Sequence, residues 1–166
     1  MARVFARRSL LLALSLGGLL AYELVPRDDR RILGLLDDLC AKLTRARDAA
    51  GLAALDAALR TAALPEVTVQ AAELGEEMRG IETVVGRARE LATTAPLTFS
   101  LADAEAHVSG DLARVSANLI VTERGSGEQH RDLRLTEVRL RRVGSAWRVE
   151  AVRVDPVRPA EPEARP

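Results

Sequence analysis

The second half of the chain, residues 97–154, contains four segments in which apolar and polar residues alternate. Alternation with a period of two is typical of β-strands that bury one face and expose the other. Short turns around Gly110, Gly125 and Gly144 separate the segments, and a hairpin needs such residues because they tolerate a positive φ. This half therefore predicts a curved, antiparallel meander whose apolar face must be covered by another part of the chain.

The first half supplies helices that can cover this face. Apolar residues recur at steps of three and four over residues 28–49, in the stretch from Gly51 to Pro65, and over residues 75–94. This spacing predicts three amphipathic helices. Residues 67–71 alternate and predict a short strand. The order of elements indicates an α+β domain over residues 28–154, built from a curved antiparallel sheet and about three helices.

The N-terminal residues predict a membrane anchor. Several arginines precede residues 9–25, which carry no charge except Glu23. A run of about 17 apolar residues is close to the length needed to cross the hydrocarbon core as a helix. The alternative is a cleaved signal peptide, but Leu19 stands where cleavage after Ala21 requires a small residue. We therefore expect residues 1–27 to be one uncleaved transmembrane helix in the inner membrane, with the domain on the periplasmic side.

Composition excludes some classes of partner. The net charge is zero and aromatic residues make up 2% of the chain, so neither electrostatic attraction nor base stacking favours nucleic acid. We expect no nucleic-acid partner. The Pro-rich tail, residues 155–166, has no apolar periodicity and is expected to be disordered. Cys40 shares a helix side with Leu36 and Leu43, which favours a small buried group over a nucleophile.

The order of helices and strands resembles that of the nuclear-transport-factor-2-like superfamily, which includes ketosteroid isomerases and polyketide cyclases. The resemblance rests on residues 74–81, 110–115 and 141–149, and it covers residues 30–154. It implies a cone-shaped sheet whose interior can hold a small apolar ligand. Members with an N-terminal anchor include periplasmic subunits of type IV secretion systems and Mce-associated membrane proteins, which share this layout.

Eight apolar residues on the predicted helix and strands are expected to line the cone. They are Leu36, Leu39, Leu43, Phe99, Val115, Ala117, Leu119 and Trp147. The apolar face of residues 113–121 carries no acid, base or nucleophile. We therefore expect no cofactor. The two histidines, His107 and His130, lie far apart in sequence without a nearby cysteine, so we also expect no metal site.

The segment that begins at Leu97 leaves one alternative open. Its apolar residues occupy odd positions through Leu101 and even positions from Ala102 onward, as expected if a bulge near residues 101–103 exchanges the two faces. With such a bulge, Asp103, Glu105 and His107 face solvent. Without it, the two carboxylates and the imidazole lie beside the apolar face, and Asp103 and His107 become candidate catalytic groups.

The sequence favours a non-catalytic function. Isomerase chemistry of the family needs a carboxylate base and hydrogen-bond donors, commonly including a tyrosine on the first helix, whereas Tyr22 is the one tyrosine of the chain. We expect a membrane-anchored module of the cell envelope that binds a ligand or another protein. The alternatives are an enzyme of the ketosteroid isomerase or cyclase type, and a structural homodimer formed through the open face of the sheet.

Overall fold

The computed structural model describes residues 28–72, 75–94, 96–124 and 129–157. Within these residues the chain forms three helices and six strands. In chain order they are α2 (Asp28–Arg45), α3 (Ala49–Ala62), β1 (Ala63–Ala71), β2 (Glu76–Arg79), α4 (Ile81–Thr94), β3 (Leu97–Ser109), β4 (Leu112–Arg124), β5 (Gln129–Val143) and β6 (Ala146–Pro156). The predicted α+β fold with three helices and a four-strand meander is confirmed. The predicted anchor, residues 1–27, and most of the predicted tail lie outside the described residues.

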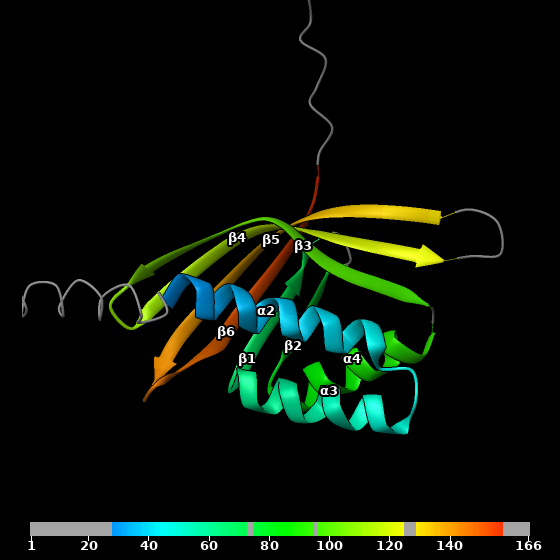
Figure 1. The fold of residues 1–166 in the computed structure, drawn as a ribbon, viewed down its shortest axis with the longest axis horizontal. Helices are drawn as coiled ribbons and strands as arrows, with labels where there is room; N and C mark the ends of the chain where they lie inside the picture. The colour runs from blue at the N-terminus through cyan, green and yellow to red at the C-terminus, as the bar shows by residue number, and fades with distance from the viewer. Residues whose placement is uncertain (1–27, 73–74, 95, 125–128, 158–166) are drawn as a thin grey trace, which may run out of the picture.

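The strands form a single curved sheet in the order β2-β1-β6-β5-β4-β3. All three helices lie on one side of it, with α2 along β3 and the α3–α4 pair beside β1 (Figure 1). We call the side that the helices cover the helix face, and the opposite side the open face. The prediction of a purely antiparallel sheet is wrong in one place, because β1 runs parallel to β6.

The third predicted helix begins later than expected. Residues 76–79 form the edge strand β2, which pairs with β1, and α4 begins only at Ile81. Gly80, between them, has a φ of +84°, a conformation that glycine adopts without strain and that ends the strand. Apolar spacing alone did not reveal this strand, since its pairing with β1 is a tertiary contact.

The first predicted helix ends earlier than expected, at Arg45 and not near residue 49. Asp48 caps the next helix, because its carboxylate accepts a hydrogen bond from the backbone N–H of Gly51 at 2.7 Å. The end of α2 is also tied to the edge strand β3. The Thr44 hydroxyl accepts from the Phe99 N–H at 2.9 Å, and Arg47 donates to the carbonyl oxygens of Ala92 and Leu97.

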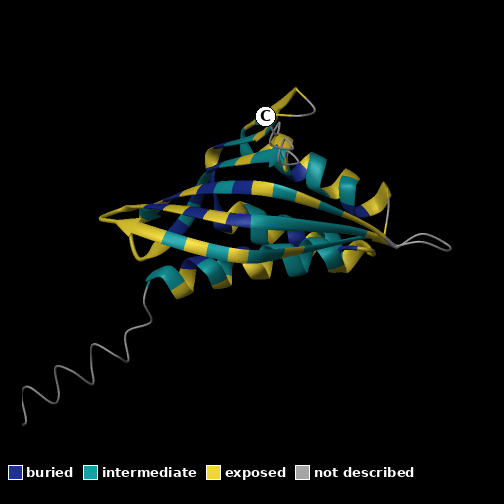
Figure 2. Cartoon of the chain, turned by 90° about the horizontal axis from the view of Figure 1, so that it is seen from above, coloured by how far each residue is buried: buried dark blue, intermediate teal, exposed yellow. Residues whose placement is uncertain are grey.

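The core lies between the helices and the helix face of the sheet. Its buried residues come from α2, β1 and the last three strands of the meander: Ile32, Leu36, Ala63, Val67, Ala113, Val115, Val138, Leu140, Trp147 and Val149. Along these strands buried and exposed positions alternate, as Figure 2 shows by colour. The alternation identifies the odd positions of β4 and the even positions of β5 as the helix face.

Candidate functional site

The sheet contains the bulge that the sequence predicted in β3. The register of β3 against β4 shifts between Ala102 and Glu105, so one extra residue enters β3 at this point. Asp103 takes up the shift with a φ of +52°, a left-handed conformation that Asp tolerates better than most residues. Its carboxylate accepts a hydrogen bond from the Asn118 amide at 2.9 Å.

The bulge determines toward which face of the sheet the candidate catalytic residues Asp103 and His107 point. Beyond it, Glu105 pairs with Ser116 and His107 pairs with Arg114, and both of these β4 residues belong to the open face. Asp103, Glu105 and His107 are all exposed. The alternative that placed two carboxylates and an imidazole beside the apolar face therefore does not hold.

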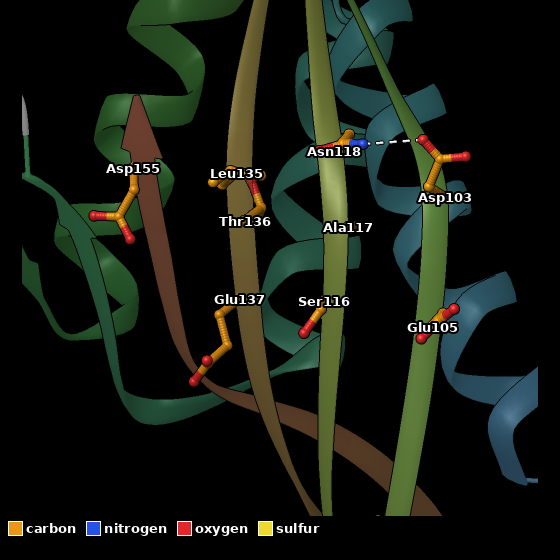
Figure 3. A pocket seen from close by; sticks show the side chains of 9 residues that line it. All are labelled: Asp103, Glu105, Ser116, Ala117, Asn118, Leu135, Thr136, Glu137 and Asp155. Atoms are coloured by element: carbon orange, nitrogen blue, oxygen red, sulfur yellow. Dashed lines mark hydrogen bonds between the residues drawn. The ribbon is translucent and has the colours of Figure 1, made fainter. Parts of the chain in front are cut away.

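Acidic side chains surround a hollow of about 350 Å³ where β3, β4, β5 and the end of β6 lie side by side (Figure 3). Its carboxylates are those of Asp103, Glu105, Glu137 and Asp155. Ser116 and Asn118 lie among them. Two of the acids have arginine partners, since Asp155 accepts from Arg153 at 2.8 Å and Glu137 lies 3.6 Å from Arg114.

A second hollow of about 260 Å³ lies on the same face, nearer to β1. Its cationic residues are Arg114, Arg139 and Arg153, and Gln70 and Thr68 of β1 contribute polar groups. Glu137 lines both hollows. The open face thus carries an acidic area directly beside a basic one.

The open face also carries exposed apolar side chains on β5. Leu133 and Leu135 are 40% and 50% exposed, and they pair with Ile120 and Asn118 of β4. The alternation of apolar and polar residues changes between Leu135 and Val138, as it does at the bulge in β3. The structure gives a different reason, because β4 and β5 pair without interruption and the two leucines simply face solvent. Val152 is partly buried and packs against the core.

The eight predicted pocket-lining residues fall into two groups. Leu36, Val115, Ala117 and Trp147 are buried and part of the packed interior. The other four are half-buried, and they are Leu39, Leu43, Phe99 and Leu119. The structure also brings to this face an ion pair that we did not predict. Arg134 and Asp132 pair opposite Leu119 and Val121, with Nη2 and Oδ2 2.7 Å apart.

Three buried side-chain atoms lack a hydrogen-bond partner among the described residues, and they are Asp29 Oδ1, Thr136 Oγ1 and Arg148 Nε. Thr136 pairs with Ala117, is 7% exposed, and its hydroxyl has no partner among the described residues. A buried hydroxyl without a partner is unfavourable by about 1–3 kcal/mol. The alternation of apolar residues in β5 did not predict a buried hydroxyl at this position.

Near the β5–β6 turn, Arg142 and Trp147 bind Asp28, the first residue of α2, and so attach the start of this helix to the sheet. The Asp28 carboxylate accepts hydrogen bonds from Arg142 and from the Trp147 indole N–H, the latter at 3.2 Å. The Arg142 guanidinium also lies over the Trp147 ring, 4.5 Å from its centroid. The hydrogen bond from Arg142 is the main reason why the pKa of Asp28 lies below its ordinary value. The indole N–H of Trp147 thus has a hydrogen-bond acceptor within the protein.

The surroundings of Cys40 keep its thiol protonated, and the acidic residues of the described chain form no metal site. Burial, with a smaller effect of Asp37, raises the pKa of the Cys40 thiol to about 11, so the thiol stays protonated at neutral pH. Among the described residues, no three His, Cys, Asp or Glu side chains are grouped so that they can hold a metal ion. In the same part of the chain, no helix is long and apolar enough to cross a membrane.

No protein-family model and no curated protein sequence matches the chain. Solved structures do resemble it. An NTF2-like protein with a cystatin-like fold from Novosphingobium aromaticivorans is 18% identical, with a TM-score of 0.66, and the match covers 83% of this chain and 88% of that one. A protein of unknown function from Mycobacterium tuberculosis is 17% identical, with a TM-score of 0.67 and coverage of 78% and 76%.

A third similar structure is the association domain of CaMKII from C. elegans, which is 15% identical, with a TM-score of 0.60 and coverage of 76% of this chain and 93% of that one. At these identities the likeness shows the fold and nothing about activity. The described chain therefore has the NTF2-like, cystatin-like α+β fold that the order of its elements implied.

Proposed function

We propose that the chain is a non-catalytic protein-interaction module of the cell envelope, held at the membrane by residues 9–25. One observation carries the proposal. The bulge at Asp103 turns Asp103, Glu105 and His107 onto the open face, away from the apolar side where a substrate would be shielded from water. The same face presents exposed leucines, acids and arginines, which suit the binding of a protein surface.

The competing enzyme of the isomerase type lacks its usual groups. Two carboxylates on the helix face, those of Asp28 and Asp132, are paired with arginine, and the hydrogen bond from Arg142 holds the pKa of Asp28 below its ordinary value. Complementation of a deletion strain tests the proposal. We expect Asp103→Ala and His107→Ala to retain function. Loss of function in either variant, with an unchanged fold and melting temperature, would refute the non-catalytic assignment.

The partner that the open face fits is a second copy of this chain. In a two-fold dimer each contact occurs twice with the roles exchanged, so an acidic area next to a basic one is self-complementary. Glu105 and Arg139 belong to these two areas, and neither has an ion pair with another described residue. The similarity to a domain named for association gives this proposal further support. An envelope protein of another kind is the alternative partner.

A charge-swap experiment tests self-association. Sedimentation of the full chain in detergent should show a dimer whose Kd rises about tenfold in Arg139→Glu, because two symmetric contacts of up to about 1 kcal/mol each are replaced by repulsion. The double variant Arg139→Glu/Glu105→Arg should restore the original Kd. A monomeric wild-type chain at high concentration, or a double variant no tighter than the single one, would refute the homodimer.

A second candidate function is the binding of a small apolar ligand between the helices and the part of the helix face that carries Leu119, Arg134 and Thr136. Its support is the buried Thr136 hydroxyl without a partner, near the half-buried Leu119 and the Arg134–Asp132 pair. Native mass spectrometry of the purified full chain should then detect a co-purified molecule that is lost in Thr136→Val. If no molecule is detected and Thr136→Val is more stable than wild type, the site is simply an unfavourable buried hydroxyl.

The proposed location is the inner membrane, with one transmembrane segment and the domain on the periplasmic side. It rests on the arginines that precede residues 9–25 and on the poor cleavage site after Ala21. External protease added to spheroplasts should degrade the domain. Protection of the domain would reverse the orientation, and a mature N-terminus near Tyr22 would replace the anchor with a cleaved signal.

A further inference from the structure

One end of the molecule combines two hairpin turns with the first residue of α2, as Figure 1 shows. We call it the hairpin end, and it consists of Asp28, residues 108–112 and residues 143–146. The Arg142 N–H donates to the Asp111 carbonyl oxygen at 2.8 Å, and the Arg142 guanidinium contacts Asp28. These contacts hold both turns and the helix start in a fixed arrangement.

The hairpin end exposes three large apolar side chains. Val108 and Leu112, on the two sides of the β3–β4 turn, are 39% and 55% exposed, and Val143, beside the β5–β6 turn, is 46% exposed. Turns of this kind ordinarily carry polar residues, because an exposed apolar group loses the free energy it would gain on burial. Such a group of apolar residues at one tip indicates a surface that becomes covered.

The chain's own sequence indicates what covers the hairpin end. Residues 9–25 are apolar apart from Glu23, and only Pro26 and Arg27 separate Val25 from Asp28. Three residue steps span at most about 11 Å. If residues 9–25 cross the hydrocarbon core, as the proposed function requires, Asp28 must lie in or beside the headgroup layer, which is about 5–8 Å thick on each side.

We infer that the hairpin end is a second membrane contact, in which Leu112 and Val143 enter the headgroup layer beside the anchor. This inference rests on the proposed anchoring. The occupant is the lipid bilayer itself, since a connection this short leaves no room for a protein between the bilayer and the hairpin end. Two apolar turns and one helix entering from the same end fix the orientation of the domain, with the long axes of β4 and β5 pointing away from the membrane (Figure 1).

Depth-dependent fluorescence quenching tests this inference on the full chain in phosphatidylcholine–phosphatidylglycerol vesicles. In a Cys40→Ala background, a nitrobenzoxadiazole probe is placed at Leu112→Cys or, as the matched control, at Leu133→Cys. Leu133 is an equally apolar residue, 40% exposed, near the opposite end of β5. Lipids that carry a nitroxide near the headgroup should quench the Leu112 probe at least about threefold more than the Leu133 probe.

Equal quenching of the two probes in vesicle-bound protein would refute the hairpin contact and leave the anchor standing. A chain that does not sediment with the vesicles would refute the anchor and the hairpin contact together. Fluorescence of Trp147, which lies behind the hairpin end and contacts Asp28, reports whether each labelled variant is folded. A second variant, Leu112→Ser/Val143→Ser, should leave sedimentation unchanged and abolish the protection of residues 108–112 against added protease.

Discussion

Substitution of Asp103 is the most direct test of the bulge on which the functional assignment depends. Asp103 holds a φ of +52°, and its carboxylate accepts the Asn118 hydrogen bond. A β-branched residue fits this conformation poorly, at a cost of about 1–2 kcal/mol. Loss of the hydrogen bond adds about 0.5–1.5 kcal/mol. We therefore expect Asp103→Val to lower the free energy of unfolding by about 2–3 kcal/mol.

Two further substitutions at the same position separate these contributions. Asp103→Asn keeps both the oxygen acceptor and the tolerance of a left-handed backbone, so its stability should stay within about 0.5 kcal/mol of wild type. Asp103→Gly relieves the backbone but loses the hydrogen bond and gains entropy in the unfolded chain, so these effects should nearly cancel.

Urea unfolding of the full chain in mild detergent, followed by Trp147 fluorescence, measures the series. With a slope of about 2 kcal/mol/M, Asp103→Val should move the midpoint down by about 1–1.5 M. The slope should not change. If Asp103→Val unfolds within about 0.3 M of wild type, residue 103 does not fix the bulge, and the argument that the bulge directs the acids to solvent is wrong.

Three other predictions concern the core, the thiol and the start of α2. Leu140→Ala, at a fully buried position, should destabilise by about 2–5 kcal/mol, whereas Leu135→Ala, at a half-exposed one, should change stability by less than about 1 kcal/mol in the same urea assay. Cys40, with a pKa near 11, should react with iodoacetamide at pH 8 far more slowly than free cysteine, and stability should fall as pH rises through 9 to 11. Because the pKa of Asp28 is lowered, its stabilising effect should be present above its ordinary pKa of 3.8 and lost as pH falls below it. Asp28→Asn should remove that part of the acid transition.

The sequence predicted the meander well because its signals are local. Gly110 and Gly144 both have a positive φ at the turns, as expected for residues placed between alternating segments. The bulge in β3 was also predictable, because an extra residue reverses the alternation at Leu101. Patterns with a period of two thus revealed strands, turns and one irregularity.

Features that depend on contacts distant in sequence were not predictable in this way. The strand at residues 76–79 looked like the start of a helix because only its pairing with β1 makes it extended. The hollows on the open face combine Glu105, Ser116 and Glu137, which become neighbours only once the register of three strands is fixed. The sequence did show many arginines interleaved with acids on the last strands, but it did not show that they separate into an acidic and a basic area.

The tie between α2 and the edge strand β3 has a consequence for aggregation. A long strand at the edge of a sheet offers free N–H and C=O groups to which another chain can add a strand. Along the first part of β3 these groups are already occupied, since the Thr44 hydroxyl bonds to Phe99 and Arg47 bonds to the Leu97 carbonyl oxygen. The end of α2 and the residues after it thereby hinder strand addition along the first part of this edge, where an added strand would have to displace these bonds.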